Sequence, residues 1–226
     1  MGWNHTTLEY CQREGIGFLE KILELGGRVL TLSDSSGYIY DEEGIDTEKL
    51  QYVMQLKNIR RARIREYCEK YPQAVYTELD PDLDYNPLWQ HKADCAMPCA
   101  TQNEINVQDA QHLVENGIQL ICEGANMPCT PDAVDLFLEH KLLYGPGKAA
   151  NAGGVAVSGL EMSQNSMRLA WSAEEVDNHL HRIMKSIHAT CLDAAQQYGM
   201  PENYLVGANI AGFVKVVHAM LDQGLV

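Results

Sequence analysis

The sequence predicts an α/β fold built on a mostly parallel sheet, because short apolar runs and helical patterns alternate along most of the chain. From about residue 18 to residue 158, strand-like runs are separated by helical patterns of about ten residues or more, an order typical of βαβ units. After residue 158 the pattern is helical almost to the end of the 226 residues. We therefore expect three segments, at 1–17, 18–158 and 159–226.

Strands are predicted where β-branched and aliphatic residues gather in short runs between turn signals. These runs cover residues 28–32, 74–79, 93–100, 118–122 and 142–144. Helical spacing of apolar residues predicts helices at 18–25, from 46 or 47 to about 69, at 106–115 and at 130–140. Thr130 followed by Pro131 is a strong helix start, because a hydroxyl caps well and proline suits the first turn.

The last third of the chain is predicted to be helical. Ser172 and Glu175 form a capping box, in which each side chain bonds the backbone amide of the other residue. The helix that follows is expected to extend to about Tyr198. A second helix carries one apolar stripe that must be buried, formed by Ile210, Val214, Val217 and Leu221.

Polar and glycine-rich residues follow four of the predicted strands, at 33–36, 101–103, 124–126 and 148–158. Ligands of parallel sheets bind at the carboxyl ends of the strands, so we expect these segments to meet at one edge. The segment 146–161 is rich in glycine, which lets a backbone approach a ligand closely. It leads into a helical pattern whose first amides are free to bind a ligand.

Five motifs closely resemble the cofactor-binding half of hexameric glutamate dehydrogenases, in the order of that family. They lie at 33–37 (SDSSG), 98–104 (PCATQNE), 123–126 (EGAN), 147–161 and 207–216. The resemblance runs from about residue 23 to 226, which is about half of a family subunit. It implies a partial Rossmann-like dinucleotide-binding domain at 18–158 and a C-terminal helical segment at 159–226. It also implies an oxidoreductase that converts L-glutamate, NADP and water into 2-oxoglutarate, ammonia and NADPH.

The resemblance also implies site residues for the substrate and the nicotinamide end of the cofactor. Ser158 would bond the side-chain carboxylate of the substrate, and Val155 would pack beside it. Asn126 and Asn151 would bond the cofactor near its nicotinamide, and the ribose and carboxamide would be bordered by Ala100, Thr101 and Gln102. The alternatives are that both asparagines only form turns and that Ser158 only caps a helix.

Ser33 and Asp34 would lie beside the adenosine ribose. An acidic residue after such a strand accepts from the 2′-hydroxyl of NAD, whereas the SDSSG string is similar to the NADP-preferring branch of the family. We expect NADP, with NAD as the alternative and a simple turn-capping role for Asp34 as a third. The nearby arginines either reach a 2′-phosphate or form a solvated helix face: Arg60, Arg61, Arg63 and Arg65.

Two features depart from the family. The glycine-rich turn that holds the pyrophosphate should precede Phe18, but Gly15-Ile16-Gly17 has no recognisable strand before it and no third glycine. The sheet is therefore expected to lack its first βα unit, and 1–17 to be unmatched. No segment resembles the family's catalytic-lysine motif, and Lys148 matches a cofactor-side motif. We assign no catalytic residue, and the alternatives to an enzyme are a non-catalytic dinucleotide-binding module or a truncated remnant.

The composition narrows the partners. A net charge of −14 disfavours binding to nucleic acid or an anionic membrane. No apolar run approaches the roughly 20 residues that span a bilayer, and no signal peptide is recognised, so a cytoplasmic location is expected. Neither the 7 cysteines nor the histidines show metal-ligand spacing. The family assembles as homo-hexamers, and assembly of this chain is an open question.

Overall fold

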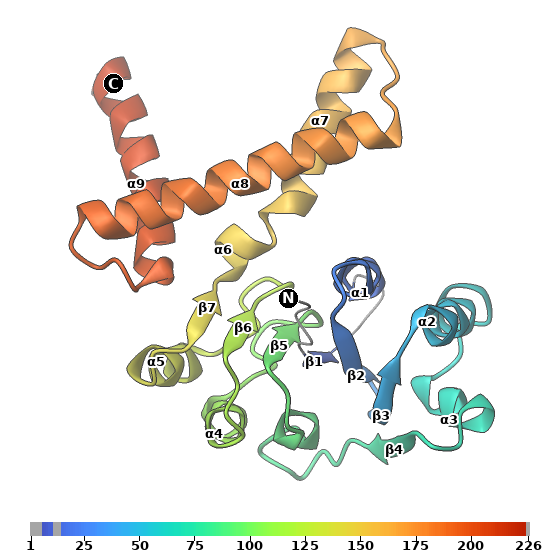
Figure 1. Cartoon of the computed structure of the whole chain (residues 1–226). Coiled ribbons are helices and arrows are strands. Elements are labelled where there is room, and N and C mark those ends of the chain that lie inside the picture. Colours follow the sequence, from blue (N-terminus) through green and yellow to red (C-terminus); the bar gives the residue numbers. More distant parts are fainter. Residues whose placement is uncertain (1–5, 11–14, 225–226) are drawn as a thin grey trace. The chain divides into compact units, whose positions relative to one another are not determined.

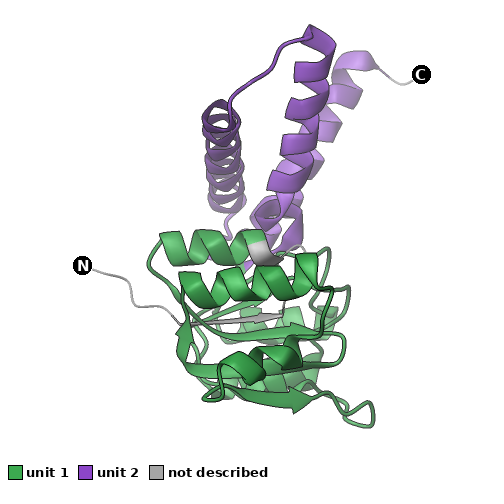
Figure 2. Cartoon of the chain, turned by 90° about the vertical axis from the view of Figure 1, so that its right-hand side faces the viewer, with its two compact units in different colours: residues 1–144 green, residues 145–226 purple. Residues whose placement is uncertain are grey.

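A computed structural model describes residues 6–10 and 15–224 of the chain, which divide into two compact units. Unit 1 comprises residues 1–144 and unit 2 comprises residues 145–226 (Figure 2). Unit 1 contains nearly all of the β-sheet, and helices lie on both faces of this sheet (Figure 1). The predicted boundary at residue 158 falls within a helix of unit 2.

The sheet is a 7-stranded α/β sheet with the order β4-β3-β2-β1-β5-β6-β7. Strand β1 pairs in parallel with β2 and β5, and β5 pairs in parallel with β6, whereas β3 is antiparallel to β2 and β4. The α/β class with a Rossmann-like sheet and C-terminal helices is thus confirmed. The strands are β1 Thr6–Tyr10, β2 Arg28–Asp34, β3 Gly37–Ile45, β4 Val75–Glu78, β5 Cys95–Pro98, β6 Leu120–Cys122 and β7 Leu143–Gly145.

The expected absence of the first βα unit is wrong. Strand β1 occupies the centre of the sheet, with Thr7 in register with Val29 of β2 and Cys95 of β5, and helix α1 (Gly15–Glu24) follows it. Its sequence has no apolar run, but threonine and tyrosine favour strands, and pairing on both edges satisfies the backbone groups of β1 and its neighbours. The departure from the family's glycine-rich turn was placed at Gly15-Ile16-Gly17, which begin α1, and strand β1 precedes them; residues 11–14 between the two elements lie outside the described residues.

Strand β3 was not expected, because apolar and polar residues do not alternate regularly along residues 37–45. It returns along β2 after a turn at Ser35-Ser36, with Asp34 in register with Gly37. A Cβ atom at Gly37 would lie 2.3 Å from the Thr77 carbonyl oxygen of β4. Only glycine therefore allows β3 and β4 to pair at this point.

The helices of unit 1 begin close to their predicted starts, with one interruption. They are α1, α2 (Thr47–Met54), α3 (Tyr67–Lys70), α4 (Val107–Glu115) and α5 (Pro131–Glu139). Asp46 caps α2, and Thr130 precedes α5 without a side-chain capping bond. A single helix was predicted as far as residue 69. Instead, α2 continues into a π-helical turn (Gln55–Ile59), and the helical conformation ends there, with Arg61 at φ 52°.

Unit 2 is helical: α6 (Gly147–Ala150), α7 (Ala152–Met167), α8 (Ala173–Gln197) and α9 (Tyr204–Gln223). The predicted capping box between Ser172 and Glu175 begins α8. A Cβ atom at Gly207 would lie 2.1 Å from the Cys191 carbonyl oxygen, so the close crossing of α8 and α9 requires this glycine. Helix α9 has a mean hydropathy of 1.5 and is long and apolar enough to span a bilayer by length and composition alone. The expectation that no apolar run reaches this length therefore does not hold for α9.

Candidate functional site

The loops that follow β5 and β6 are joined by backbone hydrogen bonds at the carboxyl edge of the sheet. The amides of Gly124 and Ala125 both donate to the Pro98 carbonyl at 3.0 Å, and the Asn103 amide donates to the Met127 carbonyl at 3.0 Å. Thr101, Gln102 and Asn126 are exposed on these loops, and Ala100 is half-buried. The structure thus brings together the two groups of residues expected near the nicotinamide within unit 1.

A buried carboxyl group supports the first of these loops. The Oε1 atom of Glu104 accepts from the Ala100 amide at 3.0 Å. Burial raises the pKa of Glu104 to about 8, even though bonds from the Ala100 and Thr101 amides act against this shift. Sequence reasoning did not single out Glu104, because a glutamate in a loop carries no signal of burial.

Another buried carboxylate lies under the second loop. Glu123 is 3% exposed, and its Oε1 atom accepts from the Tyr144 hydroxyl at 2.6 Å and from the Cys129 amide at 3.3 Å. A Cβ atom at the next residue, Gly124, would lie 2.4 Å from the Cys99 sulfur atom. Two residues of the EGAN motif therefore have structural roles. The Glu123 carboxylate holds the loop in place, and Gly124 allows close packing against Cys99 at the end of β5.

At the end of β2, the Asp34 carboxylate is surrounded by protein donors. It accepts from Lys57 Nζ at 2.8 Å, from the Ile64 amide at 2.8 Å and from the Ser36 amide at 2.9 Å, and Asp34 is 4% exposed. Burial acts to raise the pKa of Asp34, but the bonds from Lys57, Ser36 and Ile64 outweigh it, and the pKa is lowered. Asp34 is therefore ionised, and the bond from Ser36 is the turn-capping contact.

The arginine-rich segment reaches this turn. Arg63 Nη1 donates to the Ser35 hydroxyl at 2.6 Å, although 28 residues separate them. Residues 60–63 lie outside any helix, so the alternative of a solvated helix face is wrong for them. Ser33 is 2% exposed, and its hydroxyl has no hydrogen-bond partner among the described residues.

The remaining predicted site residues belong to unit 2. Asn151 occupies the N-cap position of α7, and Val155 is 79% exposed on that helix. Ser158 lies one turn further along and donates its hydroxyl to the Gly154 carbonyl at 3.2 Å. Ser158 is thus inside the helix, and the alternative that it caps a helix is wrong. Lys148 Nζ donates to the Asn209 side chain.

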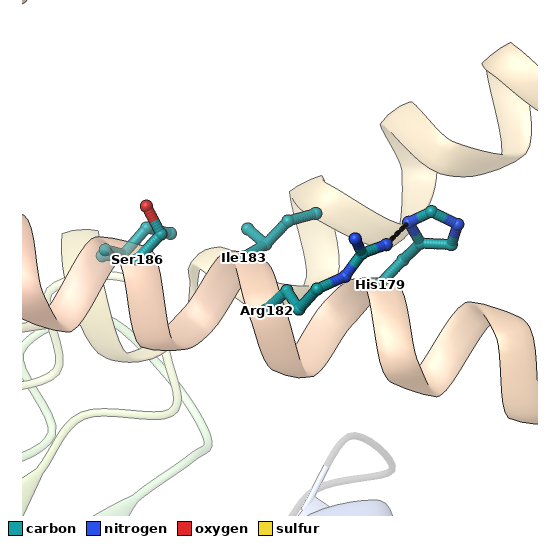
Figure 3. Close-up of a pocket in the computed structure, with 5 residues that line it drawn as sticks. His179, Arg182, Ile183 and Ser186 are labelled. Carbon is teal, nitrogen blue, oxygen red and sulfur yellow. Dashed lines mark hydrogen bonds between the residues drawn. The ribbon is translucent and has the colours of Figure 1, made fainter.

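Three hollows on the described part of the surface are lined by other residues. A hollow of about 530 Å³ lies along α8, where Arg182 Nη2 and His179 Nδ1 are 2.7 Å apart (Figure 3). Its other lining residues are Ile183, Ser186 and Ile187. A hollow of about 290 Å³ in unit 1 is lined by Glu104 and Asp109 together with residues 79–86. No cluster of three potential metal-ligating side chains occurs among the described residues.

Parallel strands, a first βα unit at the centre of the sheet and polar loops at the carboxyl edge define the class of Rossmann-like dinucleotide-binding domains. Comparison with known proteins narrows this class. A profile of the Glutamate/Leucine/Phenylalanine/Valine dehydrogenase family matches residues 15–224. The chain therefore belongs to this family.

The chain aligns over almost its whole length with about half the length of several similar proteins. The chain is 56% identical over 208 residues to a glutamate dehydrogenase of Bacteroides thetaiotaomicron, covering 92% of this chain and 45% of that protein. It is 51% identical to an NADP-specific glutamate dehydrogenase of Giardia intestinalis, again covering 92% and 45%. The crystal structure of Plasmodium falciparum glutamate dehydrogenase superposes with a TM-score of 0.91 at 40% identity, covering 98% of this chain and 46% of that one.

The chain thus spans about half the length of the relatives that it matches. Those relatives are nicotinamide-nucleotide oxidoreductases by name, and both NADP-specific and NAD-specific enzymes occur among them. The names of these relatives indicate a nicotinamide nucleotide as the cofactor of the family. They do not distinguish NADP from NAD for this chain.

Proposed function

We propose that this chain forms the nucleotide-binding half of a glutamate dehydrogenase and that its nucleotide is NADP(H). The complete reaction would convert L-glutamate, water and NADP into 2-oxoglutarate, ammonia and NADPH. Family membership and the joined loops after β5 and β6 support this proposal. The nucleotide would supply the hydride-accepting ring, while Thr101, Gln102 and Asn126 would border its nicotinamide end.

The contacts around Asp34 carry the choice of NADP. A free carboxylate at this position would accept from the ribose 2′-hydroxyl of NAD and repel a 2′-phosphate. Here the carboxylate is buried and bonded to Lys57 and two backbone amides. Arg63 meets Ser35 on the exposed side of the turn, and guanidinium and hydroxyl groups are suited to a phosphate.

On the substrate side, we propose that Ser158 and Val155 contact glutamate and that Asn151 assists at the nicotinamide end. Val155 and Ser158 are three residues apart on α7, and residues at this spacing share one face of a helix. Both are exposed and therefore accessible to a ligand. The cytoplasmic location, the homo-oligomer and the lack of nucleic-acid or membrane partners stay part of this proposal.

We propose further that the isolated chain binds the nucleotide without turning over glutamate. The observation in favour of such a non-catalytic module is that the chain matches about 45% of its relatives' length, and its sequence contains no segment like the family's catalytic-lysine motif. Steady production of NADPH from glutamate and NADP by the purified chain would refute this part of the proposal.

Fluorescence titration with NADPH and NADH tests the nucleotide assignment. Arg63→Ala is expected to weaken NADPH binding at least about tenfold, because a charged hydrogen bond contributes about 1.5–3 kcal/mol, and to leave NADH binding unchanged. Arg28→Ala is the matched control, since Arg28 begins the same strand, β2, at its opposite end. If NADH binds more tightly than NADPH, or Arg63→Ala weakens both equally, the assignment to NADP is wrong.

A further inference from the structure

The loop that follows β5 is held from within by one of its own side chains. The Glu104 carboxyl group turns back to bond the amides of Ala100 and Thr101, with the Ala100 nitrogen 3.0 Å from Oε1. Asn103 closes the turn in the left-handed region at φ 57°. Without the carboxyl group, both amides would lose this acceptor, while the Asn103 and Ile105 amides would still bond the Met127 and Pro128 carbonyls.

The second oxygen of this carboxyl group has an unusual position. Glu104 Oε2 is buried and has no hydrogen-bond partner among the described residues. The groups that face Glu104 are also acidic: Asp109 on α4, Glu123 after β6, and the Cys129 thiol, which itself interacts with Glu104. A charged carboxylate with one buried, unbonded oxygen is costly in such surroundings, so the neutral acid is the favoured form.

We propose that Glu104 is a positioning residue that, as a neutral acid, holds the Ala100–Thr101 backbone in place for the nicotinamide end of the nucleotide. The identity of the ligand in this proposal rests on the proposed function. The positioning role rests on the hydrogen bonds that Glu104 accepts within the loop. It assigns to Glu104 no contact with the nucleotide. Its effect is transmitted through the two amides and the peptide groups that they fix.

The proposal has a definite pH dependence. When the loop opens, Glu104 is hydrated and titrates near its ordinary value of 4.5, whereas in the closed loop its pKa is about 8. Between these values the open loop releases a proton that the closed loop keeps, so opening becomes up to about tenfold more favourable per pH unit. The closed loop is therefore most stable at low pH, and this contribution is lost as the pH rises toward 8.

Hydrogen exchange of the Ala100 and Thr101 amides measures this opening directly, after division by the intrinsic exchange rates. In the unmodified chain, protection is expected to fall by up to about tenfold per unit between about pH 5.5 and 7.5. Glu104→Gln keeps an acceptor and no charge, so its protection should be nearly constant. Glu104→Leu should lose protection at every pH, and Glu115→Gln, on an exposed helix end, should behave like the unmodified chain.

NADPH titration of the same variants tests the link to the ligand. Glu104→Leu should bind NADPH at least about tenfold more weakly, and Glu104→Gln should restore binding. Unchanged protection in Glu104→Leu, a pH-dependent loss in Glu104→Gln, or full NADPH affinity in a Glu104→Leu chain with an unprotected loop would each overturn the proposal. If the unmodified chain binds no NADPH, the proposed function fails together with the ligand role, while the exchange data still decide whether Glu104 holds the loop.

Discussion

Replacing Lys49 by methionine is expected to destabilise unit 1 strongly, because it removes one partner of a buried ion pair. Lys49 Nζ lies 2.9 Å from Asp41 Oδ2 and 2.8 Å from the Gly44 carbonyl oxygen. Asp41 is 0% exposed and Lys49 is 8% exposed. The Tyr67 hydroxyl, at 2.8 Å, also donates to Asp41 Oδ2, so the carboxylate is the centre of a small buried network.

The expected magnitude follows from the distance and the burial. At 2.9 Å, with an effective dielectric constant of about 20, the attraction between the two charges is about 6 kcal/mol. Desolvation offsets part of this attraction. Lys49→Met leaves a buried carboxylate with only Tyr67 and one backbone amide, and we expect the free energy of unfolding to fall by about 3–5 kcal/mol.

Urea unfolding measures this loss, with fluorescence of Trp89, which is fully buried in unit 1, as the signal. The substitutions Trp3→Phe and Trp171→Phe remove the other two tryptophans and so isolate the Trp89 signal. Lys70→Met is the matched control, because Lys70 pairs with Glu48 at 3.4 Å on the surface, where an ion pair contributes little, and this variant should cost far less than Lys49→Met. The double variant with Asp41→Asn should recover part of the loss. Equal costs for the two lysine variants, or strict additivity in the double variant, would refute the reasoning.

Other expectations can be checked by unfolding experiments. Gly207→Ala should lower the thermal midpoint by several degrees, since its Cβ would overlap the Cys191 carbonyl, whereas Gly212→Ala meets no atom within 4 Å and should raise helix stability by up to about 1 kcal/mol. A Gly207→Ala chain as stable as the unmodified one would contradict the close crossing of α8 and α9. Glu104→Gln should gain stability relative to the unmodified chain by up to about 1.4 kcal/mol per pH unit between pH 4.5 and 8; a pH-independent difference would contradict it. Phe137→Ala, at a fully buried position, should cost about 3–5 kcal/mol in urea unfolding.

The structure follows the sequence most closely where the signals are local. Ser172 begins α8 through the predicted capping box with Glu175, and Asn106, where a helix was predicted to begin, caps α4. Each predicted strand, at 28–32, 74–79, 93–100, 118–122 and 142–144, overlaps an observed strand. Caps and strand runs depend on residues within about one turn or one strand, so a linear pattern contains the information that decides them.

The candidate site was predictable only in part. The rule that parallel strands end at one edge predicts that the loops carrying Thr101 and Asn126 meet, and backbone hydrogen bonds join these two loops. The contact of Arg63 with Ser35 was not foreseen, because the charged run suggested only a 2′-phosphate contact or a solvated helix face. The burial of Asp34 and Glu104 was not foreseen, since burial of an acid depends on what packs around it.

By itself, the sequence determined the α/β class, the caps, the positions of most strands and the family of this protein, because these depend on short-range patterns and on motifs that survive in order. The tertiary structure alone decided that residues 6–10 enter the sheet between β2 and β5, that β3 folds back on β2, and that the helix after residue 54 breaks so that Arg63 reaches Ser35. Each of these outcomes depends on hydrogen bonds or charges between residues distant in the chain. Their free energies depend on neighbours in space that are distant in the sequence, and a local sequence pattern does not show which residues these are.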